Sequence, residues 1–60
     1  MTSYRAQFLT HADEIFGVAH FEAEDDVAAI SYANEKLATG IGKGHQIWEE
    51  DRLVHTEIYK

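Results

Sequence analysis

Hydrophobic and polar residues alternate along the first part of the chain. Between Tyr4 and Thr10 every second residue falls on the same side, a period of two that is typical of a β-strand. The polar segment 11–14 interrupts the alternation and suits a hairpin turn. Residues 15–23 are rich in β-branched and aromatic side chains, which favour a second strand. The chain is therefore predicted to begin with an antiparallel hairpin.

The spacing of apolar residues then changes to that of a helix. The positions that form one stripe along this helix are Val27, Ile30, Ala33 and Leu37. Carboxylates come just before the stripe, where they accept hydrogen bonds from free N–H groups and suit the positive end of the helix dipole. Gly40 stands where a C-terminal cap glycine belongs. The pattern predicts one helix from Asp25 to Thr39.

The last third of the chain predicts two more strands. They cover residues 45–49 and 52–59, with a tight turn at Glu50-Asp51. The whole chain, residues 1–60, then forms one domain of the α+β class, in which two hairpins make a four-stranded antiparallel sheet (ββαββ) and one helix packs on one face. The strand orders 2-1-3-4 and 1-2-4-3, numbered along the chain, both keep all neighbours antiparallel, and the sequence does not choose between them.

Residues that oppose each other across a hairpin share a face of the sheet. With regular turns, Tyr4 opposes Phe21, Leu9 opposes Phe16, and Trp48 opposes Leu53. One face then holds the apolar residues that we assign to the core beneath the helix. They are Tyr4, Ala6, Phe8, Ile15, Gly17, Ala19, Phe21, Ile47, Val54 and Ile58.

The opposite face also carries apolar side chains, and one helix cannot cover both sides of a sheet. Its large members are Leu9, Phe16, Val18, Trp48, Leu53 and Tyr59, with Gln7, His20, Gln46 and His55 around them. Monomers rarely expose a contiguous apolar patch larger than a few hundred Å². We therefore predict an interface here, either a twofold contact in a homodimer or a docking patch for another protein. The alternative is a register slip of one residue, which would exchange the two faces and place Trp48 in the core.

The composition adds a reason to expect a second subunit. A chain of 60 residues buries only about 60% of the surface that its unfolded form exposes, so its core is small. Domains of this size are usually stabilised by disulfides, a metal or another subunit. This chain contains no cysteine. The sources of additional stability that remain are histidine or carboxylate side chains and oligomerisation.

Charge and hydropathy limit the classes of partner. The net charge of −6 argues against direct nucleic-acid binding, because such binding requires a basic surface. No apolar run reaches the length of about 18–20 residues that a membrane span needs. No secretion signal is visible. We expect a cytoplasmic protein that binds neither nucleic acid nor membranes directly.

The sequence offers no catalytic motif. Residues 40–44 read GIGKG, but a phosphate-binding loop precedes a helix and has Ser or Thr after its lysine, whereas Lys43 is followed by Gly44. Ser3 and Ser31 lack the GxSxG pattern of a nucleophile elbow. A chain this short also has little room to enclose a pocket of the usual size. We expect no enzymatic activity and no cofactor.

The four histidines do not follow the spacing of a metal motif. There is no HxH or HExxH, and no cysteine completes a zinc-binding set. We interpret them as polar surface residues and predict no metal site. The alternative is a weak metal or small-molecule binder, in which His20, His45 or His55 would converge.

Carboxylates gather in two segments, 22–26 and 49–51. Helix capping and solubility account for them. The alternative is an acidic inhibitor that imitates nucleic acid, as some phage-encoded or defence-related proteins do. Its binding to a basic target would weaken as the salt concentration increases. The carboxylates that would line its ridge are those of Glu22, Asp25, Asp26, Glu49, Glu50 and Asp51.

Three motifs spread over the chain carry a resemblance. They are YRxxFL at residues 4–9, EDDxxAI at 24–30 and WxxxRLV at 48–54. Together they resemble a group of small uncharacterised alphaproteobacterial proteins of ββαββ architecture. The resemblance implies that architecture and no activity. The first turn reads His11-Ala12-Asp13-Glu14 and departs from the group's usual DADG-like turn, so the resemblance does not imply its turn type.

Overall fold

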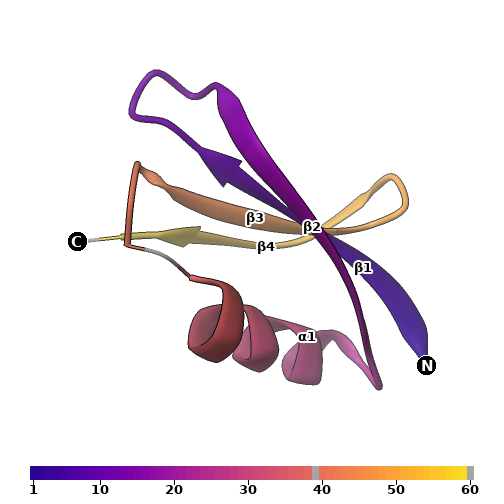
Figure 1. The fold of residues 1–60 in the computed structure, drawn as a ribbon. Coiled ribbons are helices and arrows are strands. Elements are labelled where there is room, and N and C mark those ends of the chain that lie inside the picture. Colours follow the sequence, from indigo (N-terminus) through magenta and orange to yellow (C-terminus); the bar gives the residue numbers. More distant parts are fainter. Residues whose placement is uncertain (39, 60) are drawn as a thin grey trace.

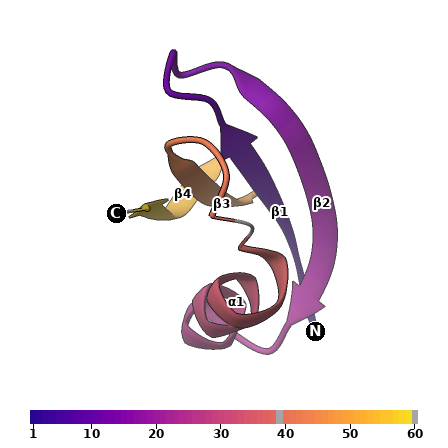
Figure 2. The same cartoon turned by 60° about the vertical axis from the view of Figure 1, so that its left-hand side comes forward.

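The computed structural model describes residues 1–38 and 40–59. Its elements are β1 (Thr2–Leu9), β2 (Ile15–Ala23), α1 (Asp26–Tyr32), the π-helical turn η1 (Ala33–Leu37), β3 (Gly44–Glu49) and β4 (Arg52–Ile58). The strands form one antiparallel sheet in the order β2-β1-β3-β4, and the helix lies on one side of it (Figures 1 and 2). The predicted α+β fold is confirmed, and of the two predicted strand orders the structure has 2-1-3-4.

The helix begins where the sequence predicts it and ends earlier. Asp25 is the N-cap, and its Oδ1 accepts a hydrogen bond of 2.8 Å from the backbone N–H of Ala28. After α1 the helix widens into η1, and Ala38 then turns extended at ψ 125°, so the helix stops before Gly40. The predicted end, Thr39, lies outside the described residues. No helix in residues 1–38 and 40–59 is both long enough and apolar enough to cross a membrane.

A connector of residues 40–43 returns the chain from the helix to the sheet. Gly42 has φ 84°, and a Cβ there would lie 2.4 Å from the carbonyl oxygen of Leu9. This close approach is possible because glycine has no side chain and tolerates positive φ. The backbone N–H of Lys43 donates to the same carbonyl at 2.9 Å. The connector is thereby held against the end of β1.

The core lies between the helix and the sheet. Tyr4, Ala23, Ala29, Ala33 and Ile47 are buried there, each at most 5% exposed. Small side chains on the helix allow a close approach to the strands, so the large Ile47 of β3 is completely covered.

Three of the side chains predicted to face the core stay exposed, namely Val27, Ile15 and Ile58, and Ile58 is 48% exposed. Val27, in the predicted helix stripe, is 75% exposed, whereas Ile30 and Leu37 are partly buried against the core. Ile15 is 53% exposed, because it lies on the other side of the sheet. Three stacked rings extend the core towards β2, with centroids 5.8 Å apart for Tyr4–Phe21 and 5.0 Å apart for Phe21–Tyr32.

Each hairpin contains one irregularity in its register. In the first, the predicted pairs are confirmed from Tyr4↔Phe21 to Phe8↔Gly17, but Leu9 then pairs with Ile15 and leaves Phe16 as an extra residue. In the second, Trp48↔Leu53 is confirmed, but the next pair along β3 is Ile47↔His55, which leaves Val54 as an extra residue. A bulge of one residue exchanges the two faces for every residue beyond it.

Candidate functional site

The candidate site is the side of the sheet that the helix does not cover, here called the helix-free face. Three cross-strand rows of side chains make up this face. They are Ile15–Leu9–Gly44–Ile58, Val18–Gln7–Gln46–Thr56 and His20–Arg5–Trp48–Leu53, each read from β2 to β4. Residues within a row are direct neighbours, so two of the rows bring side chains from four strands together, and the row that contains Gly44 brings together side chains from three.

The outer strands of the helix-free face hold four large aliphatic side chains that are about half exposed. Their exposed fractions are 53% for Ile15, 49% for Val18, 46% for Leu53 and 48% for Ile58. Leu9 lies between the two isoleucines and is only 7% exposed. Leu9 is thus covered at one end of the face, Gln7 and Gln46 occupy its middle row, and the apolar flanks remain in contact with water. Excluding water from these flanks would be favourable by roughly 25 cal/mol for each Å² covered.

A cation lies at one end of the helix-free face. The guanidinium carbon of Arg5 is 5.8 Å from the centroid of the Trp48 ring, and His20 opposes Arg5 on β2. These three side chains help to line a hollow of about 200 Å³. Among the described residues Arg5 has no ion pair, and its Nε is buried without a hydrogen-bond partner. Glu50 also lines this hollow, so a carboxylate of the chain itself borders the same space as Arg5.

The structure places three of the six predicted interface residues on this face without burying them fully, namely the exposed Val18 and Leu53 and the partly buried Trp48. Leu9 belongs to the same face but is buried within the sheet. Phe16 and Tyr59 lie on the helix side instead. The ring of Phe16 is 6.3 Å from that of Phe8, and the Tyr59 ring is 5.6 Å from that of buried His45.

The two bulges account for these differences in placement. The extra residue in β2 turns Phe16 towards the helix side and leaves Ile15 on the helix-free face. The extra residue in β4 does the same for Tyr59 and Ile58. Ile15 and Ile58 are therefore members of the face that the sequence analysis assigned to the core. Their apolar character was visible in the sequence, but no residue type marks where the extra residue enters each strand.

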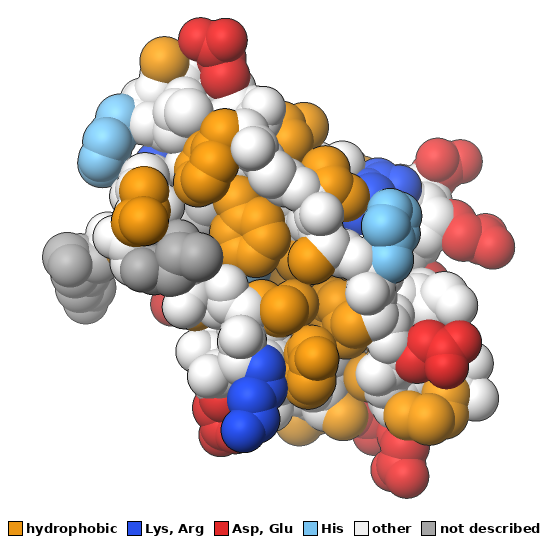
Figure 3. Space-filling view, in the orientation of Figure 1, with side chains coloured by type: hydrophobic (Ala, Val, Ile, Leu, Met, Phe, Trp, Pro, Cys, Tyr) orange, Lys and Arg blue, Asp and Glu red, His pale blue; other side chains and the backbone are white. Residues whose placement is uncertain are grey.

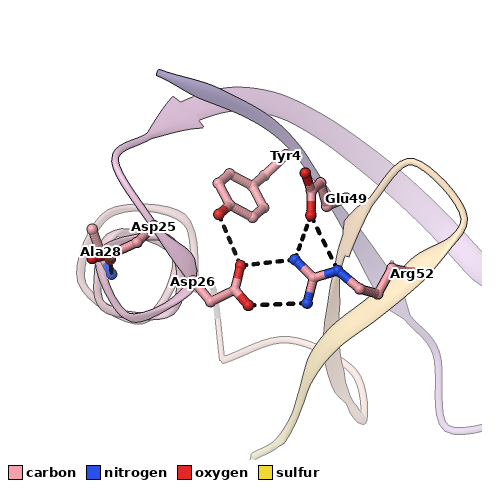
Figure 4. Close-up of polar contacts among 6 residues, drawn as sticks. All are labelled: Tyr4, Asp25, Asp26, Ala28, Glu49 and Arg52. Carbon is pink, nitrogen blue, oxygen red and sulfur yellow. Dashed lines mark hydrogen bonds and ion pairs between the residues drawn. The ribbon is translucent and has the colours of Figure 1, made fainter.

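A second polar arrangement fastens the start of the helix to the sheet (Figure 4). Arg52 on β4 donates to both carboxylate oxygens of Asp26 at 3.0 Å, and its Nε donates to Oε1 of Glu49 at 3.1 Å. The Tyr4 hydroxyl donates to Asp26 at 2.9 Å. Bidentate pairs of this kind fix orientation as well as distance. They join β1, β3 and β4 to the first turn of α1.

These contacts change the pKa values of the groups involved. The hydrogen bonds from Arg52, followed by that from Tyr4, lower the pKa of Asp26 below its usual value of 3.8. Burial, followed by the neighbouring Asp26 carboxylate, raises the pKa of Tyr4 above 10.0. Asp26 is therefore ionised and Tyr4 protonated near neutral pH. An open hollow of about 450 Å³ lies beside them, also lined by Glu24 and Asp25.

The network bears on the predicted imitation of nucleic acid. Two of the six carboxylates in that hypothesis, those of Asp26 and Glu49, are paired with the same arginine. Arg52 offsets the negative charge of both side chains, which are 43% and 34% exposed. Imitation of nucleic acid stays a prediction.

His45 is the one buried polar residue among the described positions. It is 0% exposed, and its Nδ1 lies 2.7 Å from the hydroxyl of Tyr59. Its Nε2 is buried and has no hydrogen-bond partner in the described part of the chain. Burial lowers the pKa of His45 below 6.5, and this outweighs the opposing effect of Glu57. The neutral imidazole is therefore the form that the fold favours.

The histidines of the metal-binder hypothesis lie on two sides of the sheet. His45 and His55 point to the helix side, where Nε2 of His55 lies 2.9 Å from a carboxylate oxygen of Glu57, whereas His20 is on the helix-free face. Within residues 1–38 and 40–59, no three His, Asp or Glu side chains gather closely enough to hold a metal ion.

Comparison with protein-family models, with curated proteins and with solved structures found no match. The resemblance to small alphaproteobacterial proteins therefore stays a prediction.

Proposed function

We propose that the chain is a protein–protein interaction module that forms a homodimer through the helix-free face. One observation carries this proposal: four aliphatic side chains on one uncovered side of the sheet are each 46–53% exposed. They flank the covered Leu9 at one end of the face and the polar pair Gln7 and Gln46 in its middle row. Packing two such faces together would cover all four side chains in each copy, and apolar burial is the main favourable contribution to association.

The size of the chain supports a homodimer. A specific interface of standard size covers about 800 Å² on each partner, which is about a fifth of the 3953 Å² that the chain exposes. Binding that is specific for the folded state also stabilises it. A chain of 60 residues without cysteine gains stability from such a contact that its small core does not supply.

The charges of the helix-free face support self-complementarity. Arg5 and Glu22 lie on this face in neighbouring strands, because Glu22 opposes Ser3 and His20 opposes Arg5. A twofold contact lets the arginine of each copy meet the glutamate of the other. Opposite charges across an interface mainly determine partner choice and orientation.

The test uses Trp48, which is the single tryptophan of the chain and lies on the helix-free face. Quenching of its fluorescence by acrylamide, a neutral molecule, is measured in the wild type and in Leu53→Lys. Leu53 is the direct neighbour of Trp48 on β4, so a lysine there places a charge within the contact. We expect stronger quenching in Leu53→Lys, because the separated faces admit the quencher.

The matched control is Val27→Lys. It adds the same charge in place of an aliphatic residue that is 75% exposed at the start of α1, away from the helix-free face. Quenching in this variant should equal that of the wild type, and far-UV circular dichroism checks that both variants are folded. Equal quenching in all three proteins would contradict the proposal.

We also propose a cytoplasmic location. Small secreted domains of this size are usually rich in disulfides, whereas this chain has no cysteine. No catalytic or cofactor role is part of the proposal.

A further inference from the structure

The hollow at one end of the helix-free face is bordered by opposite charges that do not pair with each other. Its volume is about 200 Å³, and its lining residues are Ser3, Tyr4, Arg5, His20, Trp48 and Glu50. Among the described residues, neither Arg5 nor Glu50 forms an ion pair. In Figure 3, basic, histidine and acidic side chains gather beside the turn between β3 and β4, which contains Glu50. A cation and a carboxylate thus border one space that a small molecule can enter.

The basic part of the hollow is held in place by neighbouring side chains. The guanidinium carbon of Arg5 lies 5.8 Å from the centroid of the Trp48 ring. The indole N–H of Trp48 donates to Oε1 of Gln46 at 3.3 Å, which fixes the ring. His20 opposes Arg5 on β2 and lines the hollow as well. A guanidinium in a fixed position can bind a carboxylate through two parallel hydrogen bonds.

The acidic part of the hollow comes from a residue with an unusual backbone conformation. Glu50 is the first residue of the turn that joins the paired residues Glu49 and Arg52, and its φ is 54°. Glycine adopts this left-handed conformation far more readily than glutamate does. Strained backbone of this kind is concentrated at functional sites. A residue type that the turn does not favour therefore supplies the carboxylate of the hollow.

We propose that the hollow binds a small zwitterion, namely a free α-amino acid with an apolar side chain. The carboxylate of the ligand pairs with Arg5, its ammonium group pairs with Glu50, and its side chain lies against the Trp48 ring. The volume of about 200 Å³ is below the roughly 300–1,000 Å³ of pockets for drug-sized ligands, so the occupant has few non-hydrogen atoms. A peptide carries its terminal charges on different residues, whereas a free amino acid carries both on one carbon.

The site is complete within one chain, so it does not rest on the proposed homodimer. In a homodimer, the carboxylate of the ligand would compete for Arg5 with Glu22 of the second copy. The ligand should therefore weaken self-association, because it neutralises the charge that a second copy would meet.

The test is an NMR titration that follows the indole N–H signal of Trp48, the single tryptophan of the chain. The probes are L-leucine, isocaproate, which is leucine without its ammonium group, and isoamylamine, which is leucine without its carboxylate. We expect saturable binding of leucine in the millimolar range, since the ligand is small. Either analogue should bind at least tenfold more weakly, because it leaves one charge of the hollow unpaired. Isocaproate that binds as tightly as leucine would overturn the proposal, as would the lack of a saturable shift with leucine.

The mass of the protein is measured in the same sample by sedimentation equilibrium. Failure of the homodimer proposal is then recognised from the mass, and failure of the ligand site from the titration. A protein that sediments as a single chain and binds leucine supports the ligand site and contradicts the homodimer alone.

Two variants separate ligand binding from folding. Glu50→Gly removes the carboxylate and places at φ 54° the residue type that tolerates this conformation. This variant should be at least as stable as the wild type and bind leucine at least tenfold more weakly. Arg5→Gln should weaken leucine binding by a similar factor. The matched controls Glu35→Gln and Lys36→Gln change exposed residues of η1 outside the hollow and should bind leucine as the wild type does. Wild-type affinity in Glu50→Gly or in Arg5→Gln would overturn the proposal.

Discussion

The hydrogen bond between His45 and Tyr59 is the contact whose removal gives the clearest prediction of stability. His45 is completely buried, and its Nδ1 lies 2.7 Å from the Tyr59 hydroxyl. Its Nε2 has no partner among the described residues. Tyr59→Phe deletes the hydroxyl and keeps the ring that packs against the imidazole. The variant therefore leaves both imidazole nitrogens of a buried histidine without a hydrogen bond within the described chain.

The expected loss follows from the burial of His45. A buried polar group left without its hydrogen bond costs about 1–3 kcal/mol. The total free energy of unfolding of a 60-residue chain is about 3–9 kcal/mol, at roughly 0.05–0.15 kcal/mol per residue. Tyr59→Phe should thus remove a large fraction of the stability. For a domain of this size, each kcal/mol lowers Tm by about 4–8 °C.

The assay is urea denaturation followed by Trp48 fluorescence at a fixed protein concentration, since self-association also changes stability. The matched control is Tyr32→Phe, because the Tyr32 side chain is 41% exposed and its hydroxyl can reach water. This control should change the free energy of unfolding by no more than about 0.5 kcal/mol. If Tyr59→Phe costs no more than Tyr32→Phe, the buried hydrogen bond does not stabilise the fold and the reasoning is wrong.

Two further predictions concern protonation. The pKa of His45 is lowered in the folded state. Its contribution to stability is therefore complete above the unfolded pKa of 6.5 and is lost as the pH falls below that value. Because one proton is involved, the free energy of unfolding changes by at most about 1.4 kcal/mol per pH unit. Urea denaturation at pH 7.5 and 5.5 should show a lower free energy of unfolding at pH 5.5. The control variant His11→Gln, which lacks the histidine of the exposed turn, should show the same decrease. Equal stability at the two pH values would refute this prediction. In Arg52→Gln, the pKa of the Asp26 carboxyl should rise towards 3.8 in an NMR titration. The control variant Arg5→Gln should leave this pKa unchanged. An unchanged Asp26 pKa in Arg52→Gln would show that the bidentate pair is not formed.

The sequence predicts the fold well where local patterns decide it. The alternation in residues 4–10 and 15–23 predicts the first hairpin, and the pairs from Tyr4↔Phe21 to Phe8↔Gly17 follow from it. Asp25 is recognised as the start of the helix because a carboxylate precedes the apolar stripe. These features depend on neighbouring residues, which a single sequence displays directly.

The helix-free face is predicted only in part because its membership depends on two single-residue bulges. The predicted register holds at Val18, Trp48 and Leu53, so these residues lie on the predicted face. Beyond the bulges the faces exchange, so Ile58 replaces Tyr59 on the helix-free face. This exchange also explains the burial of His45, since Tyr59 reaches it from the helix side. The position of a bulge is decided by packing across strands, and no local residue pattern reports it.

Sedimentation equilibrium of the wild type over a series of dilutions tests self-association through the helix-free face most directly. The chain has a mass of 6.8 kDa. For the wild type, the account predicts at least twice this mass in concentrated solution and a fall towards 6.8 kDa on dilution. At the same concentration, Leu53→Lys should have half the wild-type mass, and Val27→Lys should have the wild-type mass. A wild type that sediments as a single chain at every concentration, or a Leu53→Lys variant with the wild-type mass, would contradict it.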